Sequence, residues 1–374
     1  MSYGRPIWAE INLAAIDWNM KHIRALLQPG TRFCPVIKAD GYGHGAVAMA
    51  GEAIANGAEY LAVSLLQEGQ ILREAGITLP ILLLNYNPPE ASPQVVGDNF
   101  TQTIYSMEQA RALSQTASAM GRTVKVHVKV DTGMTRVGIR PVDALDFCRA
   151  VVGLPGLELE GMFTHFATAD SLDKTFAREQ FANFTSAFTA VRGAGIALPI
   201  CHCANSATIL DMPEMHLDMV RPGIILYGLE ASDETTRPFP LAPAMHLRGR
   251  LSMVKTVPAG VPVSYGSTFR TKKETQIATV PIGYADGYTR MLSYKAQVLV
   301  AGKKVPIVGR ICMDQCMADV TGLPVAAGDP VSLFGCKEIS VDTVAAQLGT
   351  INYEVVCMVG KRVPRVYVRN PITA

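Results

Sequence analysis

The chain has 374 residues, of which 49% are hydrophobic and 18% are charged, and this composition is that of a globular protein with a large core. Its 34 lysines and arginines nearly balance its 32 acidic residues. Without a basic cluster, nucleic acid and anionic membranes are poor partners, so we expect a small-molecule partner. The length exceeds that of a single core and predicts two domains.

The N-terminus and the cysteines bear on the cellular compartment. Residues 1–12 lack the charged, apolar and small-residue order of a secretory signal, and the longest apolar runs are too short to cross a bilayer. Eight cysteines without regular spacing indicate reduced thiols rather than a disulfide framework. These observations favour the cytoplasm.

Two cysteine groups have residue types that could bind a metal. They are Cys201-His202-Cys203 and the pair Cys312 and Cys316. Because no second pair completes a set of four ligands, we predict that the protein has no metal site.

Residues 33–227 alternate short apolar, β-prone runs with amphipathic helical segments. The predicted strands are 33–37, 60–64, 81–85, 102–105, 124–130, 157–163, 199–203 and a short one at 219–220. The helical segments between them include 67–75, 107–120, 142–152 and 174–192. Eight such βα units predict a TIM-like (β/α)8 barrel. A doubly wound open sheet is the alternative, but the Gly-rich dinucleotide fingerprint that would favour it is missing.

The sequence changes character after residue 229. Residues 230–243, EASDETTRPFPLAP, are polar and Pro-rich, which is typical of a linker. Beyond them strand-like runs dominate, and only 341–348 reads as a helix. We therefore predict an α/β chain with a barrel domain at 1–240 and a mostly-β domain at 241–374.

Polar residues follow the predicted barrel strands, and functional groups of a barrel gather at these C-terminal strand ends. They are Lys38 after the first strand, Lys129, Asp131 and Arg136 after the fifth, His165 after the sixth, Asn205 and Ser206 after the seventh, and Arg221-Pro222-Gly223 after the eighth. Burying so many polar groups costs stability unless a ligand pairs with them. A lysine amine beside an anion-binding turn suits pyridoxal phosphate, whose aldehyde condenses with lysine and whose ring stabilises a carbanion at an amino acid's α-carbon.

A series of motifs extends over nearly the whole chain. They are VIKADGYGHG, HVKVDTGMTRVG, HFA, ANS, RPGIILYG, SYGSTF, GYADGYTR, CMDQ and NYE. Together these motifs resemble the bacterial alanine racemases. The resemblance implies a barrel domain, a C-terminal β domain, pyridoxal phosphate as the cofactor, and a homodimer whose active sites take residues from both subunits.

The same resemblance implies roles for the acid and base residues. Lys38 would bind the cofactor covalently and act as the base on the D face of alanine, and Tyr265 of the partner subunit would act on the L face. His165 would hydrogen-bond this tyrosine and link it toward Arg221, which would face the pyridine nitrogen. Because arginine keeps its proton, the ring nitrogen would stay unprotonated and the carbanion would be short-lived.

Binding roles also follow from the resemblance. The implied phosphate ligands are Tyr42, Ser206, the backbone of Gly223 and Ile224, and Tyr353. Arg136 would hold the substrate carboxylate or the phenolic oxygen of the cofactor, and Met313 of the partner subunit would touch the substrate. Lys129 is commonly carbamylated in this family, which would let it brace Arg136.

Two other functions stay open at this point. A fold-type III decarboxylase of a basic or diaminopimelate-like amino acid shares the barrel, the lysine and a β domain, but does not need the tyrosine of SYG as a base. A non-catalytic pyridoxal phosphate carrier resembles the barrel alone. For a racemase, tolerance of serine and other small amino acids and the choice between supplying D-alanine for peptidoglycan and degrading alanine also stay open.

Overall fold

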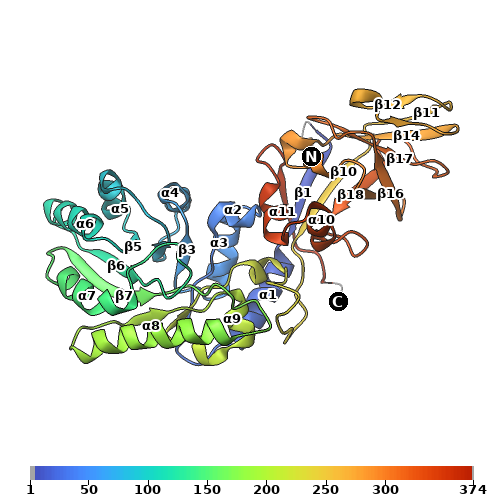
Figure 1. The fold of residues 1–374 in the computed structure, drawn as a ribbon. Coiled ribbons are helices and arrows are strands. Elements are labelled where there is room, and N and C mark those ends of the chain that lie inside the picture. Colours follow the sequence, from blue (N-terminus) through green and yellow to red (C-terminus); the bar gives the residue numbers. More distant parts are fainter. Residues whose placement is uncertain (1–4, 373–374) are drawn as a thin grey trace. The chain divides into compact units, whose positions relative to one another are not determined.

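The computed structural model describes residues 5–372, and the chain divides into two compact units. The barrel unit comprises 16–41 and 46–242, and the remaining described residues form the β unit. Figure 1 shows the elements of both units coloured along the chain. The predicted functional domains, 1–240 and 241–374, are a separate matter from these compact units and stay a prediction.

Six parallel strands form the main sheet of the barrel unit. They are β3 (Leu61–Val63), β4 (Ile81–Leu83), β5 (Thr101–Ile104), β6 (Val124–Lys129), β7 (Leu157–Phe163) and β8 (Ile200–His202). A second parallel pair, β2 (Arg32–Phe33) and β9 (Met219–Val220), completes the ring. Val36 bridges to Ala62 of β3, and the N–H of Arg221 donates to the carbonyl of Ala204 at 2.9 Å. The predicted parallel barrel is therefore confirmed.

Helices alternate with the barrel strands along the chain, and the first of them precedes β2. They are α1 (Leu13–Ala25), α3 (Ala46–Ala55), α4 (Leu66–Glu74), α5 (Ser92–Gly97), α6 (Met107–Ala119), α7 (Ala144–Val152), α8 (Thr175–Gly193) and α9 (Ser206–Asp211). Short 3-10 turns are η1 (Pro89–Ala91), η2 (Pro141–Asp143), η3 (Pro213–Met215) and η4 (Ile224–Tyr227). In α6, Ser106 caps the first turn and Ala110, Leu113 and Ala117 are buried at helical spacing, which is the pattern that predicted the helix. Within residues 5–372, no helix combines the length and the apolar character needed to cross a bilayer.

The β unit is built on a nine-stranded sheet with the order β11-β14-β17-β16-β15-β18-β10-β1-β19. Its strands are β1 (Ile7–Asn12), β10 (Met245–Arg250), β11 (Met253–Val257), β14 (Thr275–Val280), β15 (Gln297–Val300), β16 (Lys303–Val308), β17 (Cys316–Asp319), β18 (Pro330–Phe334) and β19 (Arg365–Val368). Two further strands, β12 (Pro262–Val263) and β13 (Phe269–Arg270), form a separate pair, and the 3-10 turns are η5 (Tyr265–Ser267), η6 (Tyr284–Asp286) and η7 (Arg290–Leu292). The predicted mostly-β character is confirmed.

Two features of the β unit differ from the sequence prediction. The N-terminal strand β1 pairs with β10 and β19, although no strand was predicted there. The predicted helix at 341–348 is confirmed as α10 (Val341–Leu348), but it is not the only one, because α11 (Asn352–Met358) follows. A tyrosine and two valines give this segment a weak helical propensity, and burial of Val355 and Val356 stabilises it instead.

Candidate functional site

The turn after Lys38 has an unusual backbone. In α2 (Lys38–Tyr42), Ala39, Asp40 and Gly41 have φ values of 52°, 54° and 62°, so this segment winds to the left. Left-handed backbone costs L residues roughly 1–2 kcal/mol each. Gly41 suits the position, since an added Cβ would lie 2.9 Å from Cγ of Met49.

Two carboxylates hold this left-handed turn. Glu68 accepts hydrogen bonds from the backbone N–H groups of Ala39 at 2.6 Å, Ser64 at 2.8 Å and Leu65 at 3.0 Å. Asp40 accepts from the N–H of Ala46 at 2.8 Å. Strained backbone persists only where its surroundings over-determine it, and such places cluster at functional sites. The turn therefore fixes the backbone that carries the half-buried Lys38.

Four cations act on His165. Burial lowers its pKa well below the usual value, and positive charges lower it further, namely those of Arg221, Arg136, Lys129 and Lys38. The structure thus brings five of the predicted residues together in the barrel unit. His165 is neutral at physiological pH in this surrounding.

Lys129 is a buried amine among these cations. Its Nζ donates to the carbonyl of Val130 at 2.7 Å. Burial lowers the pKa of Lys129 to about 7, with Arg221 and Arg136 lowering it further and Asp131 raising it. An amine with this pKa is partly unprotonated at neutral pH and can react as a nucleophile.

Arg221 is a buried cation held from several sides. Its Nη1 lies 2.5 Å from Nδ1 of His202, and its Nη2 donates to the carbonyls of Thr164 at 2.9 Å and Cys203 at 3.2 Å. The same Nη2 lies 3.4 Å from Nδ1 of His165. Burial lowers the pKa of Arg221 to about 10, so the guanidinium stays charged at neutral pH.

The turn between β8 and α9 presents hydrogen-bond donors. Asn205 caps α9 by accepting from the N–H of Thr208 at 3.1 Å. The buried hydroxyl of Ser206 accepts from the N–H of Gly223 at 2.9 Å, and the buried Ile224 begins η4. A hydroxyl and backbone N–H groups of this kind are suited to an anion.

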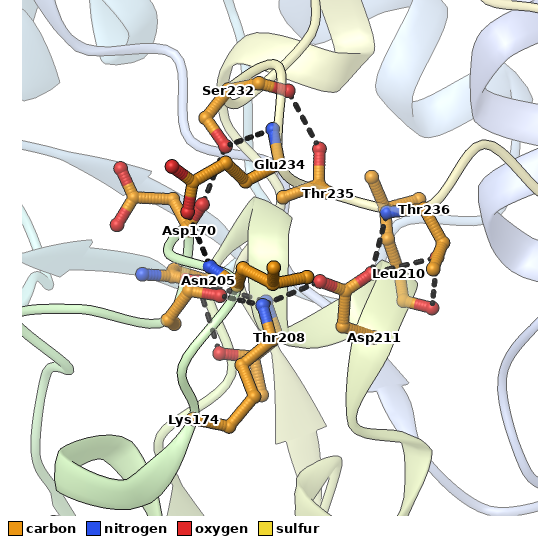
Figure 2. Close-up of polar contacts among 12 residues, drawn as sticks. Asp170, Lys174, Asn205, Thr208, Leu210, Asp211, Ser232, Glu234, Thr235 and Thr236 are labelled. Atoms are coloured by element: carbon orange, nitrogen blue, oxygen red, sulfur yellow. Dashed lines mark hydrogen bonds and ion pairs between the residues drawn. The ribbon is translucent and has the colours of Figure 1, made fainter.

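A polar network beside α9 ties residues 232–236 to the barrel unit (Figure 2). Lys174 pairs with Asp211 at 2.6 Å, and both side chains are largely buried. Asp211 also accepts from the N–H of Thr236 at 2.9 Å and from its hydroxyl at 2.6 Å. The polar segment after the last barrel strand is therefore bound to the end of α9 rather than extended as a linker.

The predicted tyrosine Tyr265 and Met313 lie in the β unit. Both side chains are exposed, at 70% for Tyr265 and 52% for Met313. They share a pocket of about 440 Å³, whose lining residues are Ser264, Tyr265, Cys312, Met313, Asp314 and Gln315. The structure thus brings these two predicted residues together.

The backbone around Tyr265 is also strained. Ser264 has φ 68° and ψ −178°, and Gly266 and Ser267 have φ values of 76° and 48°. The Ser264 conformation belongs to a region that is essentially reserved for glycine. Its hydroxyl donates to the carbonyl of Arg310 at 2.5 Å, which anchors the turn.

The remaining predicted phosphate ligands are two tyrosines of the β unit. Tyr42 is buried and Tyr353 is half-buried, and their ring centroids lie 6.2 Å apart. The other predicted ligands, Ser206, Gly223 and Ile224, belong to the barrel unit.

Sequence reasoning missed His202, a buried partner of Arg221, and the two residues beyond it, since His202 bonds to His127 and His127 bonds to Glu160. His202 appeared only as part of a rejected metal candidate, and His127 and Glu160 were not singled out. A signal was present in β6, where Lys125, His127 and Lys129 alternate with valines. At this spacing polar side chains fall on one face of a strand, so a polar lining inside the barrel could have been predicted.

Comparison with known proteins gives a consistent assignment over both units. The alanine racemase N-terminal domain family matches residues 11–231, and the alanine racemase C-terminal domain family matches residues 244–367. An alanine racemase of Desulfovibrio desulfuricans is 64% identical over 98% of this chain and 100% of its own length. One of Desulforamulus reducens is 50% identical over 97% of this chain and 99% of its own length.

Solved structures show the same likeness. The alanine racemase of Clostridium difficile 630 has a TM-score of 0.95 and 44% identity, covering 99% of this chain and 97% of its own. An alanine racemase from Bacillus anthracis with bound L-Ala-P has a TM-score of 0.93 and 39% identity, covering 98% of this chain and 96% of its own.

Proposed function

The chain belongs to the alanine racemase family, and we propose that it interconverts L-alanine and D-alanine with pyridoxal phosphate as its cofactor. The observation that carries this proposal is the set of four basic side chains around the neutral His165, in which Arg221 and Arg136 keep their charge at neutral pH. A concentration of positive charge of this kind fits anionic ligands. The phosphate of the cofactor and the carboxylate of an amino acid supply such charges.

The residues that would hold the cofactor are those that the family resemblance implies. Lys38 would hold it covalently, and Arg221 would donate to its pyridine nitrogen. The phosphate would be bound by the side chains of Tyr42, Ser206 and Tyr353 and by the backbone of Gly223 and Ile224. When bound, pyridoxal phosphate withdraws electrons from the α-carbon of an attached amino acid and so acidifies the proton there.

Racemization then requires two bases on opposite faces of the α-carbon, since a single group would have to cross its plane. Nζ of Lys38 removes or returns the proton on the D face, and the hydroxyl of Tyr265 of the partner subunit does so on the L face. Each group acts as a base in one direction and as an acid in the other. Arg136 would hold the substrate carboxylate in place.

His165 is suited to assist the tyrosine. Because Arg221 can only donate, the Nδ1 of His165 that faces it must accept. The proton of the neutral imidazole therefore lies on Nε2, which can donate a hydrogen bond. Donated to the oxygen of the partner's Tyr265, this bond would stabilise the phenolate.

Exposure of Tyr265 and Met313 in one pocket of the β unit supports a homodimer with shared active sites. In this dimer the phenol of Tyr265 would complete the active site of the second copy, and Met313 of the partner subunit would touch the substrate. Such a dimer would act on free alanine in the cytoplasm, either to supply D-alanine for peptidoglycan or to degrade alanine.

Carbamylation of Lys129 is supported by its pKa of about 7. The unprotonated amine would attack carbon dioxide, forming an N–C bond, and a proton would leave to water. The resulting carbamate is an anion, whereas the protonated form of the lysine is a cation. It would brace Arg136 through charge-assisted hydrogen bonds.

Exchange of the α-proton in D2O tests the two-base assignment. The wild-type protein loaded with pyridoxal phosphate should exchange the α-proton of both enantiomers and interconvert them. Tyr265→Phe keeps the base on the D face, so D-alanine should still exchange its proton but should not invert, and L-alanine should keep its proton. Exchange of D-alanine in this variant is the internal control for bound cofactor. Wild-type inversion by Tyr265→Phe would show that the roles are wrong.

Covalent attachment and substrate choice need separate measurements. Borohydride reduction followed by peptide mass spectrometry should place the cofactor on Lys38. A panel of serine, other small amino acids and diaminopimelate should show racemization that is fastest for alanine. Release of carbon dioxide from the longer substrates would favour the decarboxylase instead, and bound cofactor without turnover would favour a carrier.

A further inference from the structure

A chain of hydrogen bonds runs through the buried interior of the barrel unit and ends at Arg221. Nη1 of Arg221 lies 2.5 Å from Nδ1 of His202, whose Nε2 lies 2.8 Å from Nδ1 of His127. Nε2 of His127 lies 3.1 Å from a carboxylate oxygen of Glu160. Both histidines are fully buried, and Glu160 is only 6% exposed.

The two ends of this chain fix the position of every proton in it. Arginine only donates, so Nδ1 of His202 must accept and its proton must lie on Nε2. That proton points to Nδ1 of His127, whose own proton must then lie on Nε2 and point to the carboxylate. Both imidazoles are neutral, since burial lowers the pKa of His127 and of His202. The chain therefore has one direction.

Glu160 is kept ionised at its end of the chain. Burial raises the pKa of its carboxyl, but hydrogen bonds from His127, Lys125 and Tyr60 outweigh burial and hold the pKa at about 2. Nζ of Lys125 lies 2.5 Å from the carboxylate, and the hydroxyl of Tyr60 donates to it. The carboxylate therefore acts as an acceptor for three donors at neutral pH.

The backbone is shaped for this arrangement. Val126 of β6 lies opposite Leu159 and His127 lies opposite Gly161, so Glu160 is an extra residue in β7. A bulge of this kind re-aims a side chain and is common beside active sites. Gly161 leaves the necessary space, because an added Cβ would lie 2.8 Å from Cε1 of His127.

We propose that Glu160 is a positioning residue, which sets the tautomers of His127 and His202 and thereby holds the guanidinium of Arg221 in one orientation. Reversing the tautomers would turn an N–H of His202 against an N–H of Arg221. A buried donor without a partner costs about 1–3 kcal/mol. The effect on catalysis rests on the proposed function, because it requires that Arg221 face the cofactor. The tautomers do not rest on it, because they depend only on residues of the protein.

Nitrogen NMR of the full-length protein labelled with ¹⁵N in its histidines tests the tautomers without cofactor. In the wild type, His127 and His202 should both carry the proton on Nε2. Glu160→Gln leaves one acceptor oxygen for three donors, so part of the population should move the proton to Nδ1. Tyr60→Phe is the matched control, because it removes a donor and leaves the carboxylate that fixes His127.

With pyridoxal phosphate bound, Glu160→Gln should also change the absorbance of the cofactor and lower kcat for alanine at least about tenfold, by analogy with metal sites, where loss of a residue that orients a ligand has an effect of this size. KM should change little, since Arg136 is untouched. Tyr60→Phe should keep the wild-type spectrum. A merely structural role of Glu160 would alter stability without moving the tautomers or the spectrum.

The outcomes separate this proposal from the proposed function. A proton on Nδ1 of either histidine in the wild type overturns the positioning role, even where Glu160→Gln does not fold. If Glu160→Gln keeps both the tautomers and the turnover of the wild type, the positioning role is also overturned. The proposed racemization by the wild type is not affected by this outcome. Fixed tautomers in a wild-type protein that does not racemize alanine support the tautomer assignment and overturn the proposed function.

Discussion

The turns that carry the two proposed bases are both strained, but they are supported in different ways. The left-handed turn after Lys38 is held by the carboxylates of Glu68 and Asp40. The turn at Tyr265 is anchored through the hydroxyl of Ser264, and its phenol is 70% exposed. The barrel unit thus fixes the backbone at Lys38 with two carboxylates, whereas the β unit leaves Tyr265 exposed, as the proposed use of this tyrosine by a second copy of the chain requires.

Among the substitutions that test this difference, Gly41→Val should have the largest effect, because it disturbs the left-handed turn after Lys38. Valine would need φ near +62° and would place its Cβ 2.9 Å from Cγ of Met49, and β-branched residues tolerate this backbone poorly. We expect a lower thermal midpoint and loss of the cofactor band in the absorbance spectrum. Gly76→Val is the control, because Gly76 has φ +82° but no atom within 4 Å of an added Cβ. Retention of wild-type cofactor binding by Gly41→Val would show that the Lys38 turn need not be left-handed.

Much of the barrel unit followed from its sequence. Hydrophobic periodicity gave the strand positions, and the rule that strand ends carry function gave Lys38, His165 and Arg221. The left-handed winding was not predicted, because its support comes from Glu68, which lies 29 residues away from Ala39.

The remaining features depend on contacts that no local pattern contains. His127 bonds to His202 across 75 residues, and the bulge at Glu160 breaks the alternation along β7. Strand β1 was missed because both of its partners are distant in sequence, and one of them, β19, lies at the other end of the chain. Tyr265 was assigned by resemblance alone, since no strand-end rule applies to an antiparallel domain.

Replacing Lys129 with methionine tests whether the amine of Lys129 has a lowered pKa in the folded protein. The pKa of Lys129 is about 7 in the folded chain, against an ordinary value of 10.5, so between these values the unfolded chain binds more protons. Wild-type stability should therefore rise with pH across this window relative to Lys129→Met, by at most about 1.4 kcal/mol per pH unit. Urea unfolding at several pH values in buffer free of carbon dioxide measures the difference. Parallel curves would contradict the lowered pKa.

A smaller effect is expected from Glu68→Gln. The amide keeps one acceptor oxygen and no charge, so the N–H groups of Ala39, Ser64 and Leu65 all lose a charged partner and at least one of them loses its acceptor. We expect a loss of about 1–2 kcal/mol in the free energy of unfolding and weaker retention of the cofactor. Glu74→Gln, at an exposed position of the same helix, is the control. Equal behaviour of the two variants would mean that Asp40 and the barrel alone suffice to hold the turn.

The smallest expected change in stability, and the most selective change in chemistry, comes from Ser264→Ala. The variant keeps a conformation reserved for glycine and loses the bond to Arg310, so the Tyr265 turn should relax at a cost in stability of roughly 1 kcal/mol. Exchange of the α-proton of L-alanine in D2O should fall several-fold, because that face depends on Tyr265, while exchange from D-alanine by Lys38 should keep its rate. Ser264→Gly removes the strain together with the hydroxyl and so separates the two contributions. Equal losses on both faces would mean that the two turns are not supported independently, since a disturbance of one would then have reached the base carried by the other.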